Sequence, residues 1–170
     1  MSNSIATIVI AAVGVLGTLA GAAINQLLST HARRADFALQ RLERLEDFKL
    51  SCYIAMSTSS RGYRIELMNY LRKVTQRTAD KEARKVLEDS RQFCLDSLGK
   101  VELIATAEVR STIDPINDGL AKAYDATNNL EEGKPEPGGS FEEITRSLEE
   151  LWRQWNYMHE KMRRDLSMQD

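Results

Sequence analysis

Few side chains in this sequence have the types and spacing that catalysis or metal binding requires. The two histidines, His31 and His159, are far apart, and the chain has no His-Glu-x-x-His, Cys-x-x-Cys or other His/Cys cluster. No glycine-rich loop follows a strand pattern, and no serine lies at a sharp strand-to-helix turn. Adjacent carboxylates such as those at 142–143 and 149–150 are typical of the solvated face of a helix. We therefore expect no catalytic residue, metal ligand or cofactor, and a protein that is not an enzyme.

Charge is distributed unevenly along the chain. The 170 residues include 23 Lys and Arg and 25 Asp and Glu, with a formal net charge of −2, yet no charged side chain lies between Ser2 and Thr30. Every charge therefore falls in residues 31–170, which excludes a uniformly soluble globular sequence. The length suits one ordinary domain, and two cysteines are too few for a disulfide-rich secreted module.

Residues 5–28 are predicted to form a transmembrane helix. A helix of this length is roughly 36 Å long, which exceeds a hydrocarbon core of about 30 Å. A cleaved signal peptide is the alternative, since 20–22 is Ala-Gly-Ala, but residues 1–4 lack the basic residues that such a peptide carries. Arg33 and Arg34 follow the segment, so the positive-inside rule places residues 1–4 outside and the C-terminal part in the cytoplasm. We expect a single-pass protein of the cell (inner) membrane, with Cys52 and Cys94 reduced.

One face of the predicted membrane helix carries small and polar residues. Such faces allow close helix approach and interhelical hydrogen bonds in lipid, which predicts a homo-oligomer. The alternative is that glycine and alanine are simply common in membrane helices. The candidate self-association face consists of Gly14, Gly17, Thr18, Gly21 and Asn25.

The fold class predicted for the rest of the chain is all-α, with the membrane helix continuing into a cytoplasmic helical bundle or coiled coil. Residues 29–130 contain one proline and few glycines, and they show no alternating strand pattern. A first stripe at helical spacing begins this region, residues 57–62 predict a kink or a short break, and Asp114-Pro115 predicts a helix start. The stripe consists of Ala35, Ala38, Leu42, Leu45, Lys49, Cys52 and Met56.

Residues 131–139 form the clearest predicted loop, and residues 140–166 the clearest predicted helix. Ser140 and Glu143 have the spacing of a capping box at its start. The apolar residues that follow step by three and four, which is a heptad seam. We expect this seam to pack within one bundle, and pairing with a second chain is the alternative. Its members are Phe141, Ile144, Leu148, Leu151, Trp155, Met158 and Met162.

Residues 61–85 are basic, and residues 118–150 are acidic. The favoured interpretation is that the two regions pair within one bundle or between neighbours. Contact with anionic lipid headgroups is a second interpretation, and contact with nucleic-acid phosphates is the least favoured. The candidate contact residues are Arg61, Arg64, Arg72, Lys73 and Arg77.

The N-terminal part resembles a known family. Residues 13–22 read VGVLGTLAGA and are followed by a short polar step, Arg33-Arg34 and a long charged helix. This pattern, over residues 5–50, is similar to the KilB-like plasmid-spread membrane proteins of actinomycete conjugative elements. The resemblance implies an inner-membrane accessory protein for plasmid transfer between mycelia, which can be harmful when unregulated. It supplies no catalytic motif.

The function that we expect is therefore a membrane-anchored helical scaffold or accessory protein, with membrane lipid, a second copy and a protein of unknown identity as partners. One alternative is a small membrane-perturbing protein of the toxin or holin kind, whose effect would survive deletion of residues 31–170. The other is a membrane-tethered nucleic-acid-binding protein.

Overall fold

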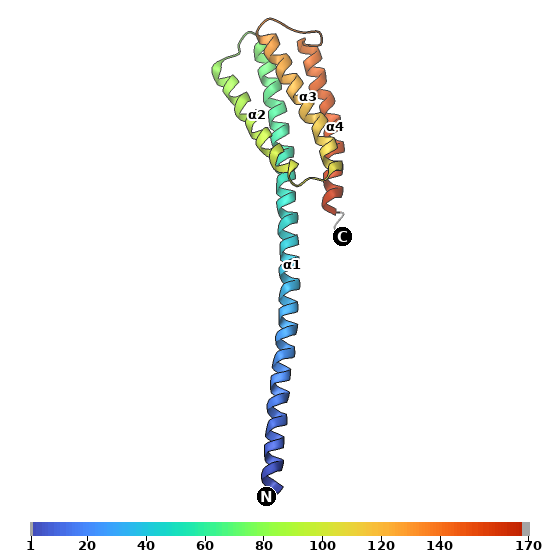
Figure 1. The fold of residues 1–170 in the computed structure, drawn as a ribbon. Coiled ribbons are helices and arrows are strands. Elements are labelled where there is room, and N and C mark those ends of the chain that lie inside the picture. The colour runs from blue at the N-terminus through green and yellow to red at the C-terminus, as the bar shows by residue number, and fades with distance from the viewer. Residues whose placement is uncertain (1, 168–170) are drawn as a thin grey trace. The chain divides into compact units, whose positions relative to one another are not determined.

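The computed structural model describes the backbone of residues 2–167 and the side chains of residue 37 and residues 39–166. Four helices and no strand make up this part of the chain: α1 (Ser2–Thr75), α2 (Lys81–Glu102), α3 (Ala107–Glu131) and α4 (Phe141–Ser167) (Figure 1). The all-α prediction is confirmed. Within residue 37 and residues 39–166, whose side chains are described, no helical stretch has the length and hydropathy that a bilayer-spanning segment needs. The side chains of the predicted membrane helix, 5–28, lie outside the described residues.

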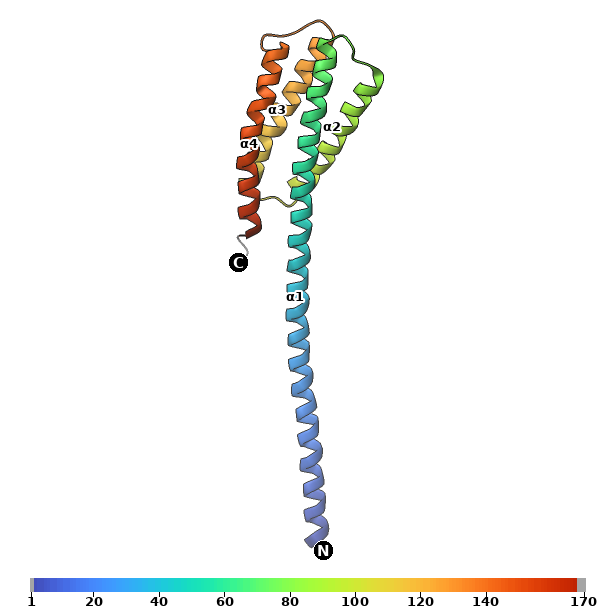
Figure 2. The same ribbon diagram turned by 180° about the vertical axis from the view of Figure 1, so that it is seen from behind.

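The chain divides into two units, residues 1–45 and 46–170, which are considered separately. In the second unit, α1 from residue 46 onward lies side by side with α2, α3 and α4, as both views show (Figures 1 and 2). Each helix contributes buried apolar side chains to one core, among them Leu67, Leu87, Ile116 and Leu148, all at most 1% exposed. The second unit is thus a four-helix bundle.

Helix α1 continues without interruption through residues 57–62, where the sequence left a kink or a break open. The hydroxyl groups of Ser59 and Ser60 donate to the Met56 carbonyl oxygen at 3.1 and 2.8 Å. Bonds of this kind satisfy a buried serine within its own helix, so the serines need no break. Residues 76–80 separate α1 from α2, and Asp80 caps α2 by accepting from the Ala83 amide at 2.7 Å.

Helix α3 begins earlier than the sequence predicted. Thr106 is its N-cap residue, and Pro115, which we expected at the first helical position, lies inside the helix. Val109 and Ile113, which precede the proline, are each 1% exposed. Burying such side chains stabilises the helix by about 1.5–3 kcal/mol each, which offsets the roughly 3 kcal/mol cost of an interior proline. The Asp114-Pro115 signal was therefore wrong, because tertiary packing outweighs it.

The connection between α3 and α4 lies one residue later than the predicted loop 131–139, because Glu131 ends α3 and Phe141 begins α4. Residues 132–140 connect α3 to α4, and Gly133 and Gly138 have positive φ angles of 71° and 86°. The capping box is confirmed: the Glu143 amide donates to Ser140 Oγ at 3.3 Å, and the Ser140 amide donates to Glu143 Oε2 at 3.2 Å. These contacts fix where α4 begins and so fix the register of its apolar seam.

Candidate functional site

One polar contact between α1 and α4 joins a serine and a histidine. Ser57 Oγ lies 2.6 Å from Nε2 of His159, and Nε1 of Trp155 lies 3.1 Å from the same nitrogen. An indole N–H can only donate, so Nε2 accepts and the proton of neutral His159 lies on Nδ1. The Ser57 hydroxyl therefore also donates to Nε2. Burial lowers the pKa of His159, and the nearby Arg163 guanidinium lowers it further.

A serine hydroxyl that donates a hydrogen bond to a histidine nitrogen resembles a nucleophile–base pair. The surroundings of Ser57, however, do not suit catalysis. Trp155 occupies the same lone pair that a general base would use. Ser57 lies well inside α1, where the backbone amides are bonded within the helix, so they are not available to stabilise an oxyanion. The arrangement instead fixes the rotation of α1 and α4 against each other.

The Ser57–His159 contact lines an apolar groove between the two helices. The groove has a volume of about 560 Å³. Most of its wall is apolar, and Tyr53, Thr58, Asn156 and Arg163 contribute the other polar groups. Its apolar lining comes mainly from Leu50, Ile54, Met162 and Leu166.

A second polar cluster joins the same helices nearby. The Lys49 ammonium lies 2.7 Å from the Asp165 carboxylate, and the Tyr53 hydroxyl donates to that carboxylate. Burial raises the pKa of Asp165, but the hydrogen bonds from Lys49 and Tyr53 outweigh it, so the net shift is downward. Asp165 therefore holds the last turns of α4 against α1 as a carboxylate.

Arg84 on α2 connects three helices through its guanidinium group. It donates to Asn128 Oδ1 at 2.7 Å and to the Tyr124 hydroxyl at 2.8 Å on α3, and its Nε lies 2.9 Å from Glu88. Its guanidinium also lies over the Tyr70 ring of α1, 5.5 Å from the centroid. The planar fork of arginine makes this set of contacts possible.

The basic residues singled out in the sequence separate into two groups. Arg61 and Arg64 lie over the Trp152 ring of α4, at 5.7 and 5.3 Å from its centroid, and Arg64 Nη1 donates to the Leu148 carbonyl oxygen at 3.5 Å. Cation–π contacts of this kind hold the two arginines on the bundle. These two side chains are engaged with α4.

The other group comprises Arg72, Lys73 and Arg77, none of which forms an ion pair within residues 39–166. Arg72 lies about 35 Å along α1 from Lys49, at a rise of about 1.5 Å per residue. The three cations are thus at the end of the bundle opposite to the one at which α1 enters it. Of the ion pairs expected between the basic and acidic regions, the described residues contain one, from Arg84 to Glu131 at 3.2 Å.

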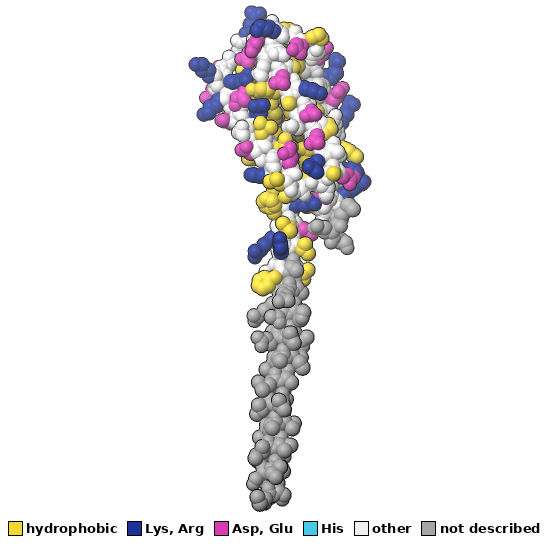
Figure 3. All heavy atoms as spheres, viewed as in Figure 1, with side chains coloured by type: hydrophobic (Ala, Val, Ile, Leu, Met, Phe, Trp, Pro, Cys, Tyr) yellow, Lys and Arg dark blue, Asp and Glu magenta, His cyan; other side chains and the backbone are white. Residues whose placement is uncertain are grey.

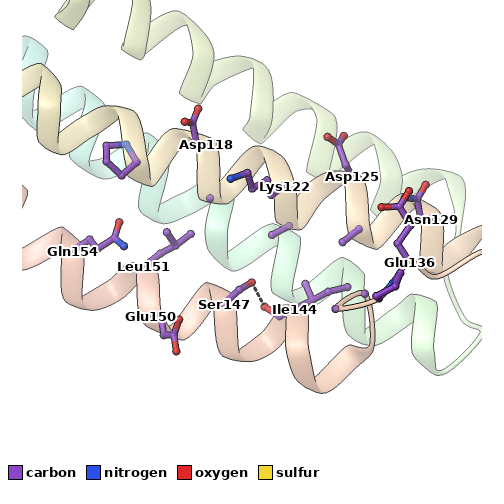
Figure 4. A pocket seen from close by; sticks show the side chains of 17 residues that line it. Asp118, Lys122, Asp125, Asn129, Glu136, Ile144, Ser147, Glu150, Leu151 and Gln154 are labelled. Atoms are coloured by element: carbon purple, nitrogen blue, oxygen red, sulfur yellow. Dashed lines mark hydrogen bonds between the residues drawn. The ribbon is translucent and has the colours of Figure 1, made fainter.

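The acidic region lines a groove between α3 and α4, with a volume of about 800 Å³ (Figure 4). Asp118 and Asp125 come from α3 and Glu150 from α4, while Leu151 points from α4 toward α3. Gly119 leaves room for Leu151, because a Cβ at Gly119 would lie 2.4 Å from Leu151 Cδ2. No group of three or more His, Cys, Asp or Glu among the described residues could hold a metal ion.

The other candidate residues are placed as follows. Six members of the 141–162 seam are buried in the core of their own bundle, and Phe141 is partly buried against it. Cys52 and Cys94 are buried and free. The five residues of the predicted self-association face, and His31, lie outside the described side chains.

The sequence analysis missed Ser57, Arg84 and Asp165, because their partners lie on other helices and no spacing along the chain relates them.

A comparison of the chain with protein-family models, curated proteins and solved structures finds no match.

Proposed function

We propose that this chain is a non-enzymatic scaffold that is anchored in the cell membrane by residues 5–28 and presents a helical bundle in the cytoplasm. The observation that carries the proposal is the uncharged stretch from Ser2 to Thr30, followed directly by Arg33 and Arg34. A stretch of this length is able to span a bilayer, and the cations after it favour a cytoplasmic C-terminal part.

The contacts of the bundle support a scaffold role. Its most specific polar groups bind each other across helices: Ser57 with His159, Lys49 with Asp165, and Arg84 with Asn128. Such contacts specify one arrangement of the four helices and leave surface grooves and exposed side chains for partners. The resemblance of residues 5–50 to KilB-like proteins suggests the setting, which is an accessory role in conjugative plasmid transfer and spread. Self-association through Gly14, Gly21 and their neighbours is part of this proposal.

Membrane fractionation and cysteine labelling test the anchor. We expect the full chain to stay in carbonate-washed membranes of a bacterial host, and a Leu16→Arg, Leu19→Arg variant to leave them. The matched Leu16→Ile, Leu19→Ile variant should remain. Ser4→Cys should react with an impermeant maleimide in intact cells, whereas Glu136→Cys in the exposed loop should react only after permeabilisation. A soluble full chain, or labelling in the reverse order, contradicts the proposal.

Truncation separates the scaffold from a membrane-perturbing protein. A fragment of residues 1–30 that still arrests growth would favour the toxin or holin-like alternative, because that effect needs only the membrane segment. If the full chain arrests growth and deletion of residues 31–170 abolishes that arrest, the scaffold is favoured.

A nucleic-acid-binding role is the second candidate, favoured by Arg72, Lys73 and Arg77, which form no ion pair with any described side chain. Binding to phosphates would weaken steeply with salt, and changing all three residues to Glu would abolish it. Binding to anionic vesicles that these substitutions remove would instead favour a lipid role.

A further inference from the structure

We propose that residues 39–46 of α1 pair in parallel and in register with the same residues of a second copy of this chain. The inference rests on the proposed function, since a shared membrane would hold two copies in the same orientation and at a high effective concentration. Two observations carry it. An apolar stripe of α1 is buried in the bundle toward its C-terminal end and exposed toward its N-terminal end, and one pair of opposite charges flanks the exposed part.

The first observation concerns a single stripe of α1 with heptad spacing. Cys52 and Met56 on this stripe are buried in the bundle, at 4% and 1% exposure. Leu42 and Leu45, which continue the same spacing toward the N-terminus, are 52% and 55% exposed. Figure 3 shows apolar side chains at the surface on the first described turns of α1. An exposed continuation of a core stripe is typical of a helix that has a further partner.

The second observation is the charge pattern that flanks this stripe. With Leu42 at position a and Leu45 at position d of a heptad, Arg41 is at position g and Glu46 at position e. Neither side chain forms an ion pair within residues 39–166. In a parallel pair, a g residue faces the e residue five positions later on the second helix. Arg41 of each copy would therefore meet Glu46 of the other.

The same pattern argues against an antiparallel arrangement. Antiparallel helices bring g positions against g positions and e positions against e positions. Arg41 would then face another arginine or an apolar side chain, and Glu46 would lose its partner. The exposed Leu39 at position e and Phe48 at position g widen the apolar surface in either case, so the charges decide the direction.

The pairing segment is short, which explains why it depends on the anchor. A seam of little more than one heptad is too short to hold two helices together in dilute solution. Tethering both copies in one membrane converts the pairing into a nearly intramolecular event, which raises its apparent affinity without any new contact.

Disulfide crosslinking of membrane-bound full-length protein tests the pairing. We expect Leu42→Cys and Leu45→Cys each to give about fivefold more crosslinked dimer than the matched Asp47→Cys, which lies on the opposite side of α1. The unsubstituted chain supplies the background, since Cys52 and Cys94 are buried. Crosslinking that occurs only when Leu42→Cys and Leu45→Cys chains are mixed would indicate antiparallel helices and overturn the proposal.

Exchanging the charges of Arg41 and Glu46 provides an independent test of the pairing. In the Leu42→Cys chain, Arg41→Glu and Glu46→Arg should each lower the crosslinked fraction, and the two together should restore it. Glu43→Arg, on the outer side of the helix, is the control and should change it little. If the chain is in the membrane but Leu42→Cys does not crosslink, the pairing is refuted and the anchor stands. If the chain is not in the membrane, the proposed function fails. The pairing is then refuted unless Leu42→Cys crosslinks at high concentration in solution.

Discussion

The hydroxyl group of Ser57 and Nε2 of His159 lie 2.6 Å apart. This contact joins α1 to α4 through two residues that are 102 positions apart in the sequence. Nε2 receives a second hydrogen bond from Trp155. Both donors require an unprotonated nitrogen, so the contact holds only while His159 is neutral. The relationship makes the α1–α4 interface sensitive to mild acid.

Acidification from pH 7.5 should therefore destabilise the bundle. The folded pKa of His159 lies below its ordinary value of 6.5, so the folded state binds fewer protons than the unfolded state. The stabilisation is complete above pH 6.5 and is lost as the pH falls from there toward the folded pKa. In that window the free energy of unfolding should fall by up to about 1.4 kcal/mol per pH unit. Denaturant unfolding at several pH values measures it.

His159→Gln is the matched control for this pH dependence, because glutamine keeps a polar side chain at the position but does not titrate. The variant should be less stable at pH 7.5 and should lose the slope that begins below pH 6.5. An identical slope in both proteins would show that another group is responsible.

Asp165 should give a second, separate loss of stability at lower pH. Its pKa in the folded state lies below the ordinary value of 3.8, since hydrogen bonds from Lys49 and Tyr53 outweigh the opposing effect of burial. Its contribution is present above pH 3.8 and disappears as the pH falls through the folded pKa. Asp165→Asn should remove about 2–3 kcal/mol at pH 7, because it leaves the largely buried Lys49 ammonium without its charge partner.

The triple variant Lys49→Met, Tyr53→Phe, Asp165→Leu checks the cause of that loss, since it also removes the buried Tyr53 hydroxyl that would lose its acceptor. Replacing both charges and the hydroxyl by apolar groups should restore much of the stability that Asp165→Asn removes. If the triple variant is as unstable as the single one, the unpaired ammonium is not the origin of the effect.

The parts of the fold that the sequence predicted well are those that depend on neighbours along the chain. The seam from Ile144 to Met162 repeats at heptad spacing, and Ser140 and Glu143 satisfy each other three residues apart. The helix start predicted at Pro115 was wrong because α3 begins earlier, where Val109 and Ile113 are buried. Their burial depends on contacts with the other helices. Contacts such as Ser57 with His159 depend on how two helix faces meet, and spacing in one sequence does not encode that directly.

Arg84 should not be replaceable by lysine. Arg84→Lys keeps the charge but loses the planar fork that contacts Asn128, Tyr124 and Glu88 together. We expect a loss of about 1–2 kcal/mol in the free energy of unfolding, close to that of Arg84→Met. Lys85→Met, at the adjacent exposed position, is the control and should stay within about 0.5 kcal/mol of the parent. Full stability of Arg84→Lys would mean that charge alone is sufficient.

Gly119 should tolerate no larger side chain while Leu151 is present. A Cβ at this position would lie 2.4 Å from Leu151 Cδ2 and 3.2 Å from Cγ, so the leucine would have to move out of its place between α3 and α4. Gly119→Val should therefore lower the free energy of unfolding by about 1–3 kcal/mol. Gly99→Ala on α2 is the matched control. A Cβ there meets no atom within 4 Å, so the higher helix propensity of alanine should stabilise the protein by about 0.5–1 kcal/mol.

A double-mutant cycle with Leu151→Ala separates crowding from a general defect of α3. Removing the leucine branch should cost stability in the parent, where Leu151 is 5% exposed, but should cost less in Gly119→Val, because the valine fills the vacated space. The two substitutions should thus be less harmful together than the sum of their separate effects. Strict additivity would show that Gly119 and Leu151 do not share one packing site, and that the loss in Gly119→Val arises within α3 itself.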